Sequence, residues 1–219
     1  MFERLLMKIR GKNSDADLRW CIDHGFRHGD NFNCFTPDAI DSNYPWLITV
    51  GDNVTISSDV KILAHDASTL LTKSHTKVGI VNIGDNVFIG AGTIVLCNTR
   101  IGDNVVIGAN SVVTHNLAAN GVYAGNPAKF ICSFDDYKAK HERALKTHRY
   151  FTERWWYDWK NATPTEWETM REQLSDTWGA IWPETPRRRA ASTASSSRRS
   201  LPPCGFPFCS MERPGSTRR

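Results

Sequence analysis

Ile83-Gly84-Asp85-Asn86-Val87-Phe88 and Ile101-Gly102-Asp103-Asn104-Val105-Val106 are two copies of one hexapeptide, and the second begins three hexapeptide lengths after the first. The same six-residue phase extends to both sides and always holds Val or Ile, at Val50, Ile56, Ile62, Ile83, Ile89, Val95, Ile101, Ile107 and Val113. A unit this short cannot bury its own apolar face, so successive units must stack and share one core. The spacing therefore predicts a β-solenoid with three six-residue faces per coil, which is a triangular prism.

The residues around each Val or Ile predict where the strands and corners lie. A β-branched side chain suits the interior of a pleated strand, whose alternate side chains point inward. The Gly-Asp-Asn that follows at 84–86 suits a corner, because these residues tolerate positive φ. We expect the solenoid to begin at His28-Gly29-Asp30, to continue in phase through Cys34 and Ile40, and to slip register around Asn43-Tyr44-Pro45.

Read together with Val122-Tyr123-Ala124-Gly125-Asn126-Pro127-Ala128-Lys129, the repeats resemble the hexapeptide-repeat acyltransferases, whose fold is a left-handed parallel β-helix. Within that superfamily, Pro45-Trp46-Leu47-Ile48-Thr49-Val50-Gly51-Asp52-Asn53 and Ile62-Leu63-Ala64-His65-Asp66 resemble O-acetyltransferases that modify sugars and surface polysaccharides. The resemblance covers roughly residues 29–132, under half of the chain. It implies a homotrimer that transfers an acetyl group from acetyl-coenzyme A to a hydroxyl of a sugar or polysaccharide precursor, with no metal ion.

The chain divides into four predicted parts. Residues 1–27 form a helical cap on the first coil, with apolar stripes at Phe2, Leu5, Leu6 and Ile9 and at Leu18, Cys21 and Ile22. Residues 28–132 form the β-helix, from which residues 67–82 are expected to protrude as a loop, because the interval from Ile62 to Ile83 exceeds one coil by three positions. Residues 133–182 are helical, and 183–219 form a disordered basic tail. Such a loop either contacts substrate or is only solvated.

Helical periodicity is expected after Cys132. Ser133 and Asp136 suggest a cap, and a first helix would present His148, Phe151, Trp155 and Trp159 on one face. A second helix would open with the capping box Thr163-Pro164-Thr165-Glu166 and carry Trp167, Met170, Leu174 and Trp178. We expect these faces to pack on the solenoid or on a neighbouring subunit; an aromatic sugar platform is the alternative.

Composition narrows the function classes. The chain has 219 residues and a formal charge of +4, but residues 183–219 hold eight Arg and two Glu, which leaves about −2 on residues 1–182. The folded part is therefore not expected to bind nucleic acid. The tail itself is either solvated, a weak contact for nucleic acid or anionic lipid, or a terminus without function. The sequence shows no transmembrane segment and no secretory signal, so a cytoplasmic location with six reduced cysteines is expected.

His65 is the predicted general base. It lies three residues after the inward Ile62, so its side chain should point outward. Acyl transfer needs a base to take the proton of the attacking hydroxyl, and imidazole suits that role near neutral pH. The resemblance implies the same role for a histidine at this position, in a groove between two subunits. Asp66 and Asp41 are predicted acceptor-side residues: Asp66 as a possible orienter of the imidazole or as a turn residue, and Asp41 as a contact to the acceptor.

The resemblance also implies where coenzyme A lies. Small residues at Ala91 and Ala109 would let the pantetheine arm approach the backbone, while Thr114, His115 and Lys129 would lie near the nucleotide end. This chain departs from its relatives at His115, where Lys is usual, and at Asn116, where Asp is usual. A neutral His115 would contribute less positive charge to phosphate binding. Cys97-Asn98 likewise replaces the common Pro-Gly, a change expected to be neutral.

Two other functions remain open from the sequence. A carbonic anhydrase of this fold would bind zinc through three histidines, for which His65, His75 and His115 are available, although these three include no close pair of the kind that such a site uses. A catalytically idle solenoid would serve as an assembly scaffold. A sugar nucleotidyltransferase is excluded, because the chain has no room for an added nucleotide-binding domain. Direct acetyl transfer is favoured over a covalent intermediate, since no cysteine or serine stands beside His65 as an evident nucleophile.

Overall fold

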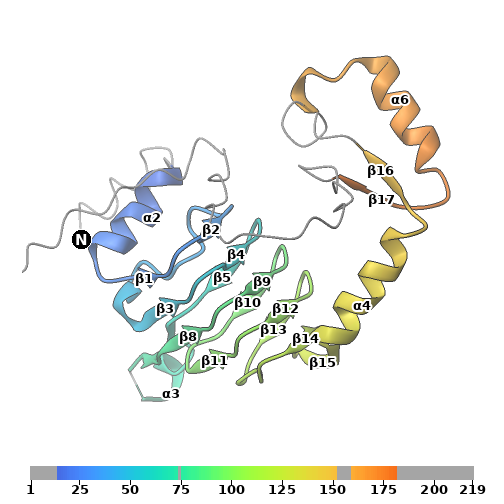
Figure 1. Cartoon of the computed structure of the whole chain (residues 1–219). Coiled ribbons are helices and arrows are strands. Elements are labelled where there is room, and N and C mark those ends of the chain that lie inside the picture. Colours follow the sequence, from blue (N-terminus) through green and yellow to red (C-terminus); the bar gives the residue numbers. More distant parts are fainter. Residues whose placement is uncertain (1–13, 74, 152–158, 182–219) are drawn as a thin grey trace, which may run out of the picture. The chain divides into compact units, whose positions relative to one another are not determined.

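The structure, a computed structural model, describes residues 14–73, 75–151 and 159–181 (Figure 1). The chain forms two compact units, which meet in sequence between Arg149 and Tyr150. The first unit is a β-helix whose short parallel strands stack coil on coil (Figure 1). The predicted helical stripe at residues 2–9 and the predicted tail at 183–219 lie outside the described residues.

Three sheets form the faces of the prism. The first sheet has the strand order β1 (Arg27–His28), β3 (Ile48–Val50), β8 (Val81–Ile83) and β11 (Thr99–Ile101). The second has the order β15 (Lys129–Ser133), β14 (Gly121–Ala124), β12 (Val105–Ile107), β9 (Val87–Ile89), β4 (Thr55–Ile56) and β2 (Asn33–Cys34). The third consists of β13 (Val112–Val113), β10 (Ile94–Val95) and β5 (Lys61–Ile62). All these pairs are parallel except β14 with β15, which is antiparallel.

The predicted inward phase is confirmed. All nine Val and Ile positions are buried, none more than 3% exposed. The strand register stacks equivalent side chains of successive coils, as in Ile83 with Ile101 and Ile89 with Ile107. The core therefore contains columns of β-branched side chains, in which each of these positions stacks on a Val or Ile of at least one neighbouring coil.

The first coil and its register slip also agree with the prediction. His28 pairs with Val50, Cys34 with Ile56, and Ile40 with Ile62, so this coil is four positions longer than the regular coil from Ile83 to Ile101. The additional residues lie where the third sheet passes to the first, and they include the 3₁₀ turn η1 (Pro45–Leu47). We call this edge of the prism the third corner; the first and second corners follow the first and second sheets.

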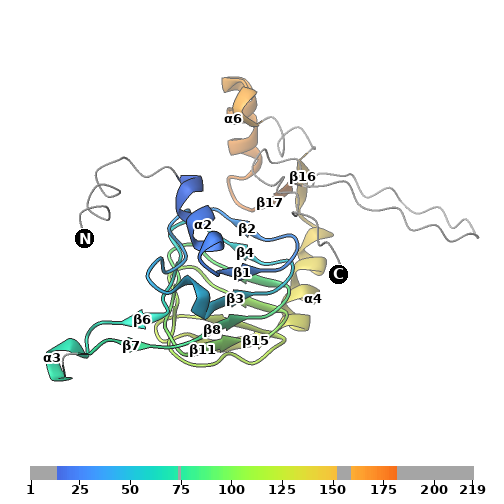
Figure 2. The ribbon, with the colours of Figure 1, turned by 90° about the vertical axis from the view of Figure 1, so that its left-hand side faces the viewer.

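The second insertion, at the same third corner, is a hairpin. Strands β6 (His65–Asp66) and β7 (Lys77–Val78) pair antiparallel, and the short helix α3 (Leu70–Lys73) lies near the tip, away from the coils (Figure 2). Strand β8 starts at Val81, so the coil resumes before the predicted end of the loop. The predicted excess of three positions was wrong. The interval from Ile62 to Ile83 replaces a single six-residue step, such as Val95 to Ile101, so the hairpin nearly doubles the length of its coil.

Helix α2 (Ser14–Asp23) covers the apolar end of the first coil. Cys21 is 2% exposed, and Leu18, Trp20 and Ile22 pack against the core cluster. Burial, followed by the nearby charge of Asp17, raises the pKa of the Cys21 thiol to about 11. None of the helices within the described residues is long and apolar enough to cross a membrane.

A ladder of asparagines runs along the first corner. Asn31, Asn53, Asn86, Asn104 and Asn120 all have φ between 54° and 60°. Each amide nitrogen donates to the side-chain oxygen of the next asparagine, at 2.8 to 3.1 Å. Asparagine tolerates this left-handed conformation, and its amide both donates and accepts, so one residue type turns the chain and ties the coils together.

Substitution of Asn86 should separate these two contributions. Asn86→Ala is expected to lower the free energy of unfolding by about 2 kcal/mol, from the cost of a left-handed alanine and the loss of two ladder bonds. Asn86→Gly loses the ladder bonds but adopts positive φ freely, so its loss should be about 1 kcal/mol smaller. Urea unfolding at one fixed protein concentration measures both values. Equal losses in the two variants would contradict a conformational role.

Beyond the solenoid, the helical prediction is only partly correct. Helix α4 (Phe134–Leu145) begins at the predicted cap, where the Ser133 hydroxyl oxygen accepts from the Asp136 N–H at 3.0 Å. The helix does not continue to Trp159, because residues Arg149–Phe151 form strand β16. The spacing of His148 and Phe151 imitated a helical face, although the chain leaves the helix after Leu145; Trp155 lies outside the described residues.

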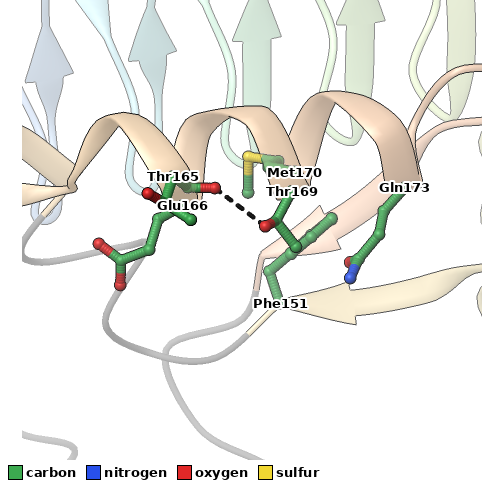
Figure 3. A pocket seen from close by; sticks show the side chains of 6 residues that line it. All are labelled: Phe151, Thr165, Glu166, Thr169, Met170 and Gln173. Atoms are coloured by element: carbon green, nitrogen blue, oxygen red, sulfur yellow. Dashed lines mark hydrogen bonds between the residues drawn. The ribbon is translucent and has the colours of Figure 1, made fainter.

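The second unit contains the predicted capped helix. Strand β16 pairs with β17 (Gly179–Ile181), and the 3₁₀ turn η2 (Trp159–Asn161) precedes α6 (Pro164–Gln173). Thr163 and Glu166 form the predicted capping box, with Pro at the first helical position. Trp178 was predicted to lie on this helix, but it lies beyond the end of α6. Phe151 and one side of α6 line a hollow of about 210 Å³ (Figure 3), with Thr165, Glu166, Thr169, Met170 and Gln173.

Candidate active site

His65 lies at the third corner, where the hairpin leaves the second coil. Its neighbour Ala64 is fully buried, while the His65 side chain keeps 26% of its surface exposed, in agreement with the predicted outward direction. The fixed edge of the β-helix therefore presents an imidazole to solvent from an anchored backbone. A group placed in this way can meet a substrate without a rearrangement of the fold.

Asp41 holds the inner nitrogen of this imidazole. The carboxylate oxygen Oδ2 of Asp41 accepts a short hydrogen bond from His65 Nδ1 and a second one, of 2.9 Å, from the Ala64 N–H. Its other oxygen, Oδ1, accepts from the Asn43 N–H at 3.0 Å, and the side chain is only 2% exposed. An ionised carboxylate only accepts hydrogen bonds, so a neutral imidazole beside an ionised Asp41 carries its proton on Nδ1. This tautomer leaves the lone pair on Nε2, the nitrogen that a general base uses.

The stacking of coils brings Asp41 to His65. Ile40 pairs with Ile62, and the Asp41 N–H donates to the Ile62 carbonyl at 3.0 Å, so Asp41 lies one coil above the start of the hairpin. The sequence predicted both residues in the site but not their pairing, since Asp41 was expected to meet the acceptor. The common phase of Ile40 and Ile62 was the available signal, because residues just after paired positions share a corner.

Two aromatic residues of the first insertion adjoin the pair. The rings of Tyr44 and His65 are tilted, with centroids 5.4 Å apart, and the Tyr44 ring meets the Trp46 ring edge-on at 5.7 Å. Tyr44 packs against the core, whereas Trp46 is 51% exposed. Tyr44 therefore limits the positions that the imidazole can adopt. Sequence reasoning did not identify it, because the register slip that carries it has no repeat pattern.

Asp66 has a local partner of its own. Its Oδ1 accepts from the Ser68 N–H at 2.9 Å, at the start of the hairpin loop. This backbone hydrogen bond, together with the Ser68 side chain, holds the pKa of the Asp66 carboxyl below its ordinary value. Of the two carboxylates considered from the sequence, Asp41 is the one hydrogen-bonded to the imidazole.

The residues predicted to bind coenzyme A lie along two edges of the prism. Ala91 and Ala109 are exposed at the second corner on successive coils, where the Asn110 N–H donates to the Ala91 carbonyl at 2.8 Å. Lys129 begins β15 opposite Ala124, near the end of the same edge. Thr114 and His115 lie at the third corner, joined by a 3.1 Å hydrogen bond between the Thr114 hydroxyl and His115 Nδ1. On one chain, the third sheet separates these two groups.

Within the described residues, no three His, Cys, Asp or Glu side chains are grouped closely enough to hold a metal ion. The cysteines Cys21, Cys34, Cys97 and Cys132 are free thiols. Burial raises the pKa of Cys34, as it does that of Cys21, so both remain protonated at neutral pH. A protonated buried thiol is a poor nucleophile. Asp41 hydrogen-bonds the His65 ring and Tyr44 packs beside it, and neither side chain is a thiol.

The sequence and the fold were compared with those of known proteins. The family model described as bacterial transferase hexapeptide (six repeats) matches residues 80–115. Protein CapG of Staphylococcus aureus is 43% identical over 143 residues, which are 63% of this chain and 82% of CapG. A putative acetyltransferase of Schizosaccharomyces pombe, C18B11.09c, is 34% identical over 118 residues, 52% of this chain and 54% of that protein. A solved maltose O-acetyltransferase from Clostridium difficile 630 is 31% identical, with 49% of this chain and 65% of that chain covered and a TM-score of 0.36.

Proposed function

The chain belongs to the hexapeptide-repeat acyltransferases, and from this membership we propose that it is an O-acetyltransferase. It would move an acetyl group from acetyl-coenzyme A to a hydroxyl of a sugar or of a surface-polysaccharide precursor. The observation that carries this proposal is the His65–Asp41 pair, a partly exposed imidazole whose inner nitrogen is held by a buried carboxylate. No metal ion has a part in the proposed reaction.

The proposed chemistry is a direct transfer. His65 Nε2 takes the proton of the acceptor hydroxyl as its oxygen attacks the thioester carbon. The C–S bond then breaks, and the imidazolium returns the proton to the leaving thiolate, so the products are an acetyl ester and free coenzyme A. Asp41 keeps Nδ1–H in place throughout and stabilises the imidazolium by its negative charge.

We extend the proposal to a homotrimer of left-handed coils in the cytoplasm. A donor that contacts both Ala109 and Thr114 needs the second corner of one copy to face the third corner of another, since the third sheet separates them on a single chain. The exposed apolar side chains of the hairpin favour contact with a second copy, since Leu71 is 94% exposed and Val78 is 50% exposed. Leu71 and Val78 would lose this exposure if the neighbouring copy packed on the hairpin.

Free-thiol release from acetyl-coenzyme A tests this function. Purified protein is incubated with acetyl-coenzyme A and a panel of free sugars and nucleotide sugars, and the mass of the acceptor is followed together with the thiol. Thiol release that depends on an acceptor, with a gain of one acetyl group, is the expected result. No release with any acceptor, combined with no binding of coenzyme A in calorimetry, would overturn the proposal in favour of a scaffold. The mass of the protein in solution tests the trimer.

A further inference from the structure

A polar hollow lies beside the base of the hairpin at the third corner. Its volume is about 370 Å³, and it is lined by Gly79, Ile80, Asn98, Arg100 and Asn116. Gly79 is essential to its shape, because a Cβ at this position would lie 2.7 Å from the Asn98 nitrogen. The residues come from the segment that follows β7 and from the next two coils, so they all belong to the first unit.

Arg100 gives the hollow a positive charge. The residue is exposed, and its guanidinium forms no ion pair with any carboxylate of the described residues. Asn116 uses its Oδ1 to accept from the Arg100 N–H at 2.8 Å. An aspartate at 116 would keep this bond but add a negative charge beside Arg100. The amide therefore orders the strand and leaves the positive charge available to a ligand.

The hollow is close to His65. The Gly79 N–H donates to the carbonyl of Ala64, the residue before His65, at 2.9 Å. Asn98 and Asn116 each follow the inward valine of the third sheet by three positions, as His65 follows Ile62. These two amides therefore follow the third sheet on the next two coils after the one from which the hairpin of His65 departs. A substrate that reaches His65 can place a second group in the hollow.

We propose that this hollow binds a phosphate group of one of the two substrates, with Arg100 as the principal contact and the amides of Asn98 and Asn116 as additional donors. Guanidinium presents paired N–H donors that fit phosphate oxygens, and amide nitrogens add neutral donors. The phosphate belongs either to coenzyme A or to an acceptor carried as a nucleotide sugar. This inference rests on the proposed function for the identity of the substrates, but not for the binding of phosphate.

Calorimetry tests the phosphate site directly. Inorganic pyrophosphate, coenzyme A and uncharged pantetheine are titrated into the full chain and into Arg100→Gln, Asn116→Asp and Arg27→Gln. Arg27 is the matched control, because it occupies the same outward register of the first sheet, three strands away in the order Arg27, Thr49, Asn82, Arg100. Arg100→Gln should weaken pyrophosphate binding about tenfold. Asn116→Asp should also weaken pyrophosphate binding, and Arg27→Gln should leave the affinity unchanged.

Kinetics then identify the substrate that carries the phosphate. If coenzyme A supplies the phosphate, Arg100→Gln weakens the binding of coenzyme A about tenfold and hardly changes the binding of pantetheine. If the acceptor supplies it, the KM for UDP-N-acetylglucosamine rises while that for N-acetylglucosamine does not. Equal affinities of all variants for pyrophosphate, or equal losses in Arg27→Gln and Arg100→Gln, would overturn the site. A wild type that binds pyrophosphate but releases no thiol would contradict the proposed function and not the phosphate site.

Discussion

Replacing His65 with alanine is expected to lower kcat by about a hundredfold or more, the typical contribution of one general base. The imidazole is the group in the pair with a free basic nitrogen, so its loss leaves the hydroxyl to transfer its proton to water. The KM for acetyl-coenzyme A should change little, since the base acts in the chemical step. Thiol release measured with saturating substrates gives kcat for the variant and the wild type.

Two further measurements make this result specific to the base. His141→Ala, which removes an exposed histidine of α4, should retain wild-type kcat. Added imidazole should restore part of the activity of His65→Ala, because a small base can occupy the space of the missing ring. A wild-type kcat in His65→Ala would remove this residue from the mechanism.

The second large effect is expected from Asp41→Asn, with kcat lower by on the order of a hundredfold. The substitution keeps the size of the side chain but turns one carboxylate oxygen into an NH2 donor. Because Oδ2 accepts from both His65 Nδ1 and the Ala64 N–H, an amide nitrogen at this position would face His65 Nδ1 as a donor and favour the tautomer with the proton on Nε2, which cannot act as a base. With the amide reversed, the oxygen would keep both contacts and the nitrogen would face the Asn43 N–H. The loss of negative charge also removes the stabilisation of the imidazolium.

A double-mutant cycle separates this positioning role from simple destabilisation. If Asp41 acts only through the imidazole, the variant with both substitutions should be no slower than His65→Ala. Asp38→Asn is the control, because Asp38 lies in the same coil and pairs with Lys61 at 2.7 Å, whereas Asp41 is the carboxylate that bonds His65. Independent, multiplicative losses in kcat would contradict the pairing, and thermal unfolding of each variant shows whether the fold is retained.

The solenoid was predictable because its information is local and repeated. The nine Val and Ile positions from Val50 to Val113 that the six-residue phase predicted to point inward are all buried. The caps at Ser133 and Thr163 were also predicted correctly, because a cap depends on residues only three apart. The prediction of a helix that reaches Trp159 was wrong, because it rested on spacing alone and not on a local motif. Four side chains at helical spacing do not fix the backbone, and the chain forms the β16–β17 pair instead.

The sequence by itself determined the prism and its corners, since a period of six fixes which side chains enter the core, and the resemblance carried by residues 62–66 made His65 the candidate base. Only the tertiary structure decided that Asp41 holds His65 and that Arg100 and Asn116 share a hollow beside it. These contacts join side chains and backbone groups on adjacent coils, whose lengths differ by the insertions at the third corner. A repeat predicts that coils stack, but the contacts at a corner depend on how each insertion folds back onto the coil beside it.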